Sequence, residues 1–274
     1  MIQVENTNAN MNKKRVALLL FGQPRFTGNR LVTYLLKKKL LDRYATDVFA
    51  CVWFDSNSSY ERSDWRLSKN IKRGELVRKS AINDLYSRYG CANLKVLSPQ
   101  KFTVPDFIPV EKYHALNIKK NLSNILSQLY IFQEAGRFIS TAEIDNYDFI
   151  VIARTDLLIN NIPNLDDLSE GFYVTSTHTR FPDLIYILSP GYIRFANTFD
   201  NMSRANWNNI TEFIPELMKR ESFLLEFPNE KPIALPLDVF NVSIVDTQNG
   251  FISLMKMFYS LMKMFYLHLR TKFL

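Results

Sequence analysis

The sequence predicts an α/β fold in which a mixed, mostly parallel sheet is flanked by helices. Two short runs, 15–21 and 47–53, are almost entirely apolar, which is typical of strands buried on both faces. Between them, residues 29–44 carry apolar side chains at helical spacing. A strand, a helix and a second strand within about 40 residues predict a parallel βαβ unit.

The centre of the chain contains a second helix followed by a strand, with a clearer hydrophobic pattern than the first. Residues 119–143 have apolar side chains every three or four positions, which predicts a long amphipathic helix. It leads into 149–153, Phe-Ile-Val-Ile-Ala, the clearest strand of the sequence. Shorter strands are predicted at 93–97, 172–175 and 184–188, and shorter helices at 190–199 and 210–221.

One main domain is predicted, because 274 residues that are 47% hydrophobic suffice for one large core. We assign it to 14–250, with a disordered leader at 1–13 and a basic amphipathic helix at 251–274. That tail contains the heptad Ser-Leu-Met-Lys-Met-Phe-Tyr twice. It is suited to lying on an anionic membrane, to packing on the main domain, or to being a frame-altered end after a duplication.

The composition narrows the function classes. Cys51 and Cys91 are the only cysteines, too few for a disulfide framework or a zinc site, and we expect buried, reduced thiols in a cytoplasmic protein. The inner face of the membrane is the alternative location. The P-loop, dinucleotide-binding and serine-hydrolase motifs are absent from the sequence. A net charge of +7 favours anionic partners: a nucleotide diphosphate, an anionic membrane or nucleic acid.

Polar residues follow three of the predicted strands, where ligands bind in open parallel sheets. The first strand ends in Gly22, Gln23 and Arg25, the second in Trp53, and the central one in Arg154 and Asp156. A glycine admits close backbone approach, arginine pairs with phosphate, tryptophan offers a flat surface to a base or sugar, and aspartate binds a divalent cation or ribose hydroxyls. The alternative is a simple Gly-Gln-Pro turn and a structural ion pair between Arg154 and Asp156.

Four segments carry a resemblance to a known family: LFGQPRF (20–26), TDVFACVWFD (46–55), SQLYIFQEA (127–135) and YDFIVIARTDLLI (147–159). They resemble bacterial and viral glycosyltransferases of the GT-A type, in the group related to WavE-like lipopolysaccharide-synthesis proteins. The resemblance spans about residues 14–225. It implies a GT-A-like, Rossmann-like sheet and transfer of a sugar from a nucleotide sugar to a saccharide or lipid-linked saccharide, for surface polysaccharide such as lipopolysaccharide or capsule.

The resemblance also assigns roles to residues. In GT-A enzymes an Asp-x-Asp motif binds Mn²⁺ or Mg²⁺ and the donor diphosphate; here Arg154 replaces the first aspartate, which leaves Asp156 as the metal ligand. A guanidinium at position 154 can itself neutralise phosphate. The resemblance implies that Gln128 faces the nucleotide, although it also fits a polar position on a helix. On the acceptor side, Asp183 is the first candidate for the catalytic base and Glu216 the second, each alternatively a turn or cap residue.

Two other functions stay open. A non-catalytic GT-A-like scaffold that binds nucleotide sugars is consistent with the incomplete Asp-x-Asp motif. A nucleic-acid-binding protein is consistent with the basic segment 61–79, beside Tyr60 and including Trp65. In that segment, however, acidic residues alternate with the basic ones, which disfavours nucleic acid as a partner.

Overall fold

The computed structural model describes residues 13–25, 27–55, 80–116, 122–176, 181–182 and 184–244. Four predictions lie wholly or almost wholly outside these ranges: the leader, the basic segment 61–79, Asp183 and the tail helix at 251–274.

The main sheet has seven strands in the order β3-β2-β1-β4-β7-β6-β8. They are β1 (Arg15–Gly22), β2 (Ala45–Trp53), β3 (Asn93–Leu97), β4 (Phe149–Arg154), β6 (Phe172–Thr175), β7 (Ile185–Leu188) and β8 (Ile233–Leu235). The first four are parallel, and β7 runs antiparallel to both β4 and β6. The order 3-2-1-4 is Rossmann-like. The predicted α/β class, with a mixed, mostly parallel, Rossmann-like sheet flanked by helices, is confirmed.

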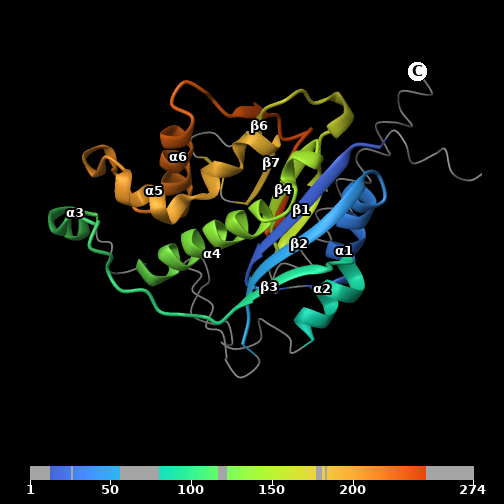
Figure 1. Cartoon of the computed structure of the whole chain (residues 1–274), viewed down its shortest axis with the longest axis horizontal. Helices are drawn as coiled ribbons and strands as arrows, with labels where there is room; N and C mark the ends of the chain where they lie inside the picture. Colours follow the sequence, from blue (N-terminus) through green and yellow to red (C-terminus); the bar gives the residue numbers. More distant parts are fainter. Residues whose placement is uncertain are drawn as a thin grey trace, which may run out of the picture.

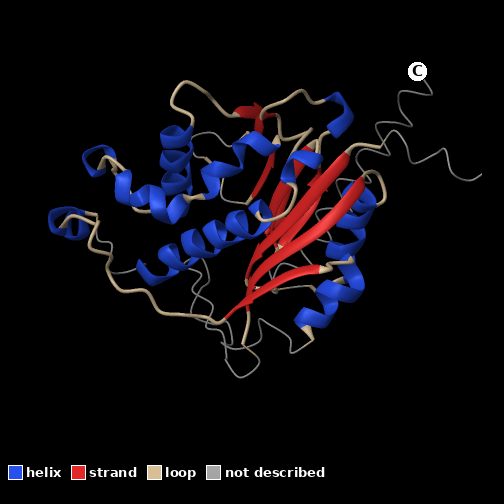
Figure 2. Ribbon diagram, viewed as in Figure 1, coloured by secondary structure: helices blue, strands red, loops and turns tan. Residues whose placement is uncertain are grey.

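Helices cover both faces of this sheet (Figures 1 and 2). One face packs against α1 (Arg30–Leu36), the π-helical turn η1 (Lys37–Leu41) and α2 (Ala81–Tyr89), and the other against α4 (Leu122–Ser140) and α6 (Pro215–Glu226). The remaining elements are α3 (Val110–Ala115), η3 (Ile144–Asn146), η4 (Leu165–Asp167), η5 (Pro190–Ala196), α5 (Thr198–Arg204) and η6 (Trp207–Asn209), and a two-stranded sheet of β5 (Leu157–Asn161) and β9 (Asn241–Ile244). Within the described part of the chain, no helix combines the length and the apolar character needed to cross a membrane.

The strand β1 lies at the centre of both hydrophobic layers. Leu18 and Leu20 point to the layer that includes α1 and α2, while Leu19 and Phe21 point to the layer that includes α4. Because both faces are buried, the strand is a continuous apolar run rather than an alternating one, as the sequence predicted.

Several predicted elements differ in their bounds. The helix predicted at 29–44 ends at Leu41 and changes from α to π geometry on the way. The helix predicted at 210–221 begins only at Pro215, because proline fits the first helical turn and disfavours helical backbone at the residue before it. The sequence pattern did not predict α2, α3, β5, β8 or β9.

Both cysteines are buried and free, as predicted. Burial raises the pKa of the Cys51 thiol to about 12 and that of Cys91 to about 11. Both thiols are therefore protonated at neutral pH, which makes them poor nucleophiles.

Candidate functional site

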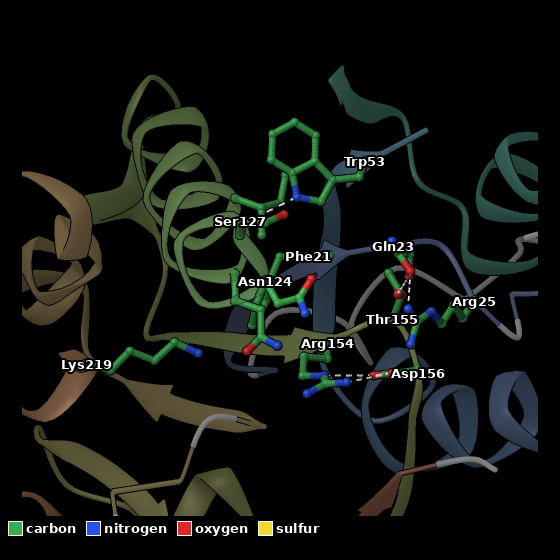
Figure 3. Close-up of a pocket in the computed structure, with 13 residues that line it drawn as sticks. Phe21, Gln23, Arg25, Trp53, Asn124, Ser127, Arg154, Thr155, Asp156 and Lys219 are labelled. Carbon is green, nitrogen blue, oxygen red and sulfur yellow. Dashed lines mark hydrogen bonds and ion pairs between the residues drawn. The ribbon is translucent and has the colours of Figure 1, made fainter. Parts of the chain in front are cut away.

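Three parallel strands end level with one another and bring their last residues to one edge of the sheet. In the register, Phe21 of β1 lies opposite Cys51 of β2 on one side and opposite Arg154 of β4 on the other. The groups that follow these strands therefore gather at the carboxyl edge, where open α/β sheets bind ligands. The helix α4 closes one side of this edge (Figure 3).

A pocket of about 120 Å³ opens at this edge. All seven residues that the sequence analysis assigned to the nucleotide line it: Gly22, Gln23, Arg25, Trp53, Gln128, Arg154 and Asp156. The structure brings them together, and their roles toward a ligand stay predictions. Six further residues complete the lining: Phe21, Asn124, Ser127, Ile131, Thr155 and Lys219.

The loop after β1 is held by hydrogen bonds to the end of β4. The Thr155 hydroxyl donates to the Gln23 carbonyl oxygen, and the Thr155 N–H donates to the Phe21 carbonyl oxygen at 3.1 Å. The Arg25 guanidinium donates to the Gln23 side-chain oxygen (Figure 3). Gly22 has a φ of +104°, so this turn requires glycine for its backbone conformation. Together these contacts fix where Arg25 enters the pocket.

Arg154 and Asp156 form a bidentate ion pair on the pocket wall. The Arg154 Nε donates to Asp156 Oδ1 at 2.9 Å and its Nη2 donates to Oδ2 at 2.7 Å. Burial by itself raises the pKa of the Asp156 carboxyl, but the charge and hydrogen bonds of Arg154 and the charge of Arg25 outweigh it, and the pKa lies below its ordinary value. The ion pair that the sequence left as an alternative is thus present, and it lies beside the pocket rather than in place of it.

Trp53 is less available to a ligand than the sequence analysis expected. Its side chain is only 4% exposed. One face of the indole stacks on Tyr130 at a centroid distance of 5.8 Å, and its Nε1 donates to the Ser127 carbonyl oxygen at 3.4 Å. The ring therefore packs β2 against α4, and little of it is accessible to a ligand.

Lys219 is the lining residue whose chemistry the sequence analysis missed. It projects from α6, is 1% exposed, and its Nζ lies 4.5 Å from the ring centroid of Phe132 and 5.2 Å from that of Phe21. The signal was present in the sequence: Lys219 belongs to the same helical stripe as the buried residues Ser222 and Phe223, where an apolar side chain is the usual choice.

Of the two predicted catalytic bases, Glu216 is the one that the structure describes. Glu216 is half-buried in the first turn of α6 and is not one of the residues that line the pocket. Asp183 lies outside the described residues.

Within the described part of the chain, the residues that line the pocket do not make a suitable ligand set for a divalent cation. Mg²⁺ and Mn²⁺ prefer several oxygen ligands that carry negative charge. Asp156 is the single carboxylate among the lining residues that the structure describes, and both its oxygens already accept hydrogen bonds from Arg154. No cluster of three or more potential metal ligands occurs among the residues that the structure describes.

The comparisons with known proteins are remote. No protein-family model and no curated protein matches the chain. Among solved structures, the mannosyltransferase Ktr4p from S. cerevisiae matches with a TM-score of 0.37 and 9% identity, over 81% of this chain and 53% of Ktr4p. Ktr4p in complex with GDP matches with a TM-score of 0.32 and 12% identity, over 81% of this chain and 54% of Ktr4p. The chain thus spans about half the length of this structural neighbour.

Proposed function

We propose that the protein is a glycosyltransferase that moves a sugar from a nucleotide-sugar donor to a saccharide or lipid-linked saccharide. The observation that carries this proposal is the meeting of Arg25, Arg154 and the Gly22 turn at the carboxyl edge of one parallel sheet. Planar guanidinium groups match phosphate oxygens, and a glycine turn offers backbone to them. The volume of about 120 Å³ is below the roughly 300–1,000 Å³ of pockets that enclose a drug-sized ligand, which fits a site for one end of a nucleotide sugar.

The arginines support the step in which charge develops. The acceptor hydroxyl oxygen attacks the anomeric carbon, the bond from that carbon to the phosphate oxygen breaks, and its electron pair leaves with the nucleotide diphosphate. The hydroxyl proton passes to a carboxylate, with Asp183 as the first candidate and Glu216 as the second. Cations fixed before the reaction stabilise the departing diphosphate without reorganising, which is the largest contribution in many enzymes.

The cellular role proposed is the synthesis of surface polysaccharide, such as lipopolysaccharide or capsule, in the cytoplasm or at the inner face of the membrane. The basic segment at 251–274 supports a peripheral contact with anionic lipid.

A nucleotide-sugar screen tests the proposal. UDP-, GDP- and CMP-sugars are titrated with and without Mn²⁺, and the melting temperature is followed, because a ligand that binds only the folded state raises it. The affinity of the donor that binds is then measured for the wild type and for the variants Arg25→Gln and Arg88→Gln. Arg88 is exposed on α2, on the other face of the sheet, so its replacement removes the same charge away from the pocket.

We expect R25Q to bind the donor at least about 10-fold more weakly than the wild type, because a charge-assisted hydrogen bond contributes about 1.5–3 kcal/mol. R88Q is expected to bind within about twofold of the wild type. Equal binding by R25Q and R88Q, or the absence of binding by every nucleotide sugar, contradicts the proposal.

A second candidate function is a non-catalytic scaffold that binds nucleotide sugars. It is favoured because Asp156 is the single carboxylate among the described lining residues, and both its oxygens already accept hydrogen bonds from Arg154. Donor turnover separates the two candidates: the transferase releases nucleoside diphosphate when acceptor is present, whereas the scaffold binds the donor and leaves it intact.

A further inference from the structure

One face of α4 forms a side of the pocket. Asn124, Ser127, Gln128 and Ile131 are three or four positions apart along the helix, so they share a face, and all four line the pocket. Figure 3 shows Asn124 and Ser127 on the side of α4 that faces the ends of the strands. Asn124 is exposed, Ser127 and Gln128 are half-buried, and Ile131 is 2% exposed. This wall is therefore polar toward the solvent and apolar at its inner end.

The polar part of this face is uncharged. From Leu122 to Gln133 the helix contains no acidic or basic residue, whereas Glu134 and Arg137 follow further along. A helix face that meets only water ordinarily carries charged side chains, so amides and a hydroxyl indicate a more specific use. Within the described residues, the Asn124 and Gln128 side chains make no hydrogen bond, which leaves both amides to a ligand in the pocket.

Amide and hydroxyl side chains match the hydroxyl groups of a sugar. Each amide has two N–H donors and an acceptor oxygen, and a serine hydroxyl both donates and accepts. A sugar hydroxyl also donates and accepts, so these side chains pair with it in either sense. Neutral groups of this kind discriminate between ligands, because a ligand that lacks one hydroxyl leaves a polar group of the site unpaired.

A nucleobase is a less suitable partner for this face. Bases commonly bind by stacking on an aromatic ring. Trp53, the pocket residue that the sequence predicted for that role, stacks on Tyr130 and is only 4% exposed. At the inner end of the wall, Ile131 and Phe21 belong to one buried cluster, and they offer the apolar surface on which a ring packs while polar groups fix its orientation.

We propose that Asn124, Ser127 and Gln128 form the subsite for the sugar ring of the donor and determine which sugar is accepted. This inference rests on the proposed glycosyltransferase function, in which the donor phosphate binds at the strand ends of the same pocket. The sugar is bonded directly to that phosphate, so its ring lies within reach of α4. Gln128 is thereby assigned to the sugar instead of the nucleotide.

The test compares a nucleotide sugar with its parent nucleotide, because the two differ by the sugar alone. The probes are UDP-glucose with UDP, GDP-mannose with GDP, and CMP-N-acetylneuraminate with CMP, each titrated calorimetrically. The pair whose nucleotide sugar binds the wild type most tightly is then titrated into the variants.

The variants are Asn124→Leu, Gln128→Met and Asn83→Leu. Leucine and methionine keep the approximate size of the amides and remove their hydrogen-bonding groups. Asn83 is an exposed asparagine on α2, which packs on the other face of the sheet, so N83L is the matched control.

We expect N124L and Q128M each to bind the nucleotide sugar at least about fivefold more weakly than the wild type and the parent nucleotide within about twofold. A fivefold loss corresponds to about 1 kcal/mol, which is the usual contribution of one neutral hydrogen bond. N83L is expected to bind both ligands within about twofold of the wild type.

The other outcomes separate this inference from the proposed function. Equal losses for the nucleotide sugar and the parent nucleotide assign the face to the nucleotide and overturn the sugar subsite, while the glycosyltransferase proposal stands. Unchanged binding of the nucleotide sugar by either variant removes that residue from the subsite. Failure of every nucleotide sugar to bind the wild type removes the proposed function itself.

Analogues that lack one sugar hydroxyl test for direct contact. The wild type is expected to bind at least one of them about fivefold more weakly than the parent nucleotide sugar. The matching variant is expected to bind that analogue as the wild type does, within about twofold, because the hydrogen bond is absent from both complexes. Equal binding of every analogue by the wild type, or a loss in the variants that is the same for all analogues, contradicts the proposal.

Discussion

The side chains of Arg154 and Asp156 show how one pair of residues serves both the fold and the pocket. Asp156 sits at the end of β4 with a side chain that is only 6% exposed, so its charge requires a partner. Arg154 supplies two hydrogen bonds and remains 21% exposed at the pocket. The carboxylate thereby fixes the orientation of a guanidinium that points to the ligand space. We interpret Asp156 as a residue that positions Arg154.

The substitution Asp156→Asn tests this interpretation through stability. Breaking a buried ion pair by removing one partner costs about 3–5 kcal/mol, and we expect D156N to lose about 3 kcal/mol at pH 7 because Arg154 keeps some access to water. The pKa of Asp156 is lower in the folded than in the unfolded chain, so its contribution to stability is complete above the ordinary value of 3.8 and declines as the pH falls below it.

Urea unfolding of wild type and D156N at pH 7, 5 and 3 gives the measurement. The difference in free energy of unfolding is expected to be the same at pH 7 and pH 5 and about 1 kcal/mol smaller at pH 3. A difference that is constant down to pH 3, or that grows there, contradicts an ionised and stabilising Asp156.

At the scale of elements, the sequence was sufficient to predict helix or strand for the long segments that bury most of their own side chains. The strands β1 and β4 are continuous apolar runs, and α4 has an unbroken apolar stripe, so their type follows from local pattern. The unpredicted strands depend on partners that are distant in the sequence. The strand β8 has three residues, two of them exposed, and exists through its pairing with β6. The strand β5 begins directly after Arg154, Thr155 and Asp156, and it pairs with β9, which is distant in the sequence.

The same distinction applies to the candidate site. Residues placed by the ends of parallel strands, such as Gly22 and Arg154, were predicted to meet because strand ends share an edge. Lys219 was not predicted, because it reaches the pocket from a helix whose position depends on tertiary packing against α4. The contact of Trp53 with Tyr130 was not predicted for a related reason: the two residues are distant in the sequence.

The helix α4 approaches η5 at a position that only glycine allows. A Cβ built on Gly136 lies 2.5 Å from the Ala196 Cβ. Gly136→Ala gains about 1 kcal/mol of helix propensity but overpacks this contact, which costs about 1–3 kcal/mol. We expect G136A to be less stable than the wild type by up to about 2 kcal/mol.

The double variant separates the contact from other effects of the substitution. Ala196→Gly removes the opposing Cβ, so G136A is expected to be less destabilising in an A196G background by about 1 kcal/mol or more. Thermal or urea unfolding of the four proteins provides the cycle. Additive effects, or a G136A protein more stable than the wild type, show that the two elements adjust without strain.

At the scale of the whole molecule, the charge of +7 attracts any anion, and the pocket decides which one is held. In the proposed function a small diphosphate binds in the pocket, whereas a polyanion would contact basic residues spread over the surface. These two modes respond differently to salt, since each phosphate neutralised on a nucleic acid releases counterions.

Salt dependence therefore distinguishes the proposed donor site from the nucleic-acid alternative. Between 50 and 200 mM NaCl, we expect the affinity for a random single-stranded oligonucleotide to fall at least about 100-fold and the affinity for the best nucleoside diphosphate to fall less than about 10-fold. R25Q is expected to lower the affinity for the nucleotide and to leave the affinity for the oligonucleotide within about twofold of the wild type, because the oligonucleotide does not bind in the pocket. Fluorescence anisotropy at four salt concentrations measures both ligands. If the oligonucleotide stays bound at 200 mM and displaces the nucleotide, then nucleic acid occupies the pocket, and the cations at the sheet edge serve nucleic-acid binding instead of sugar transfer.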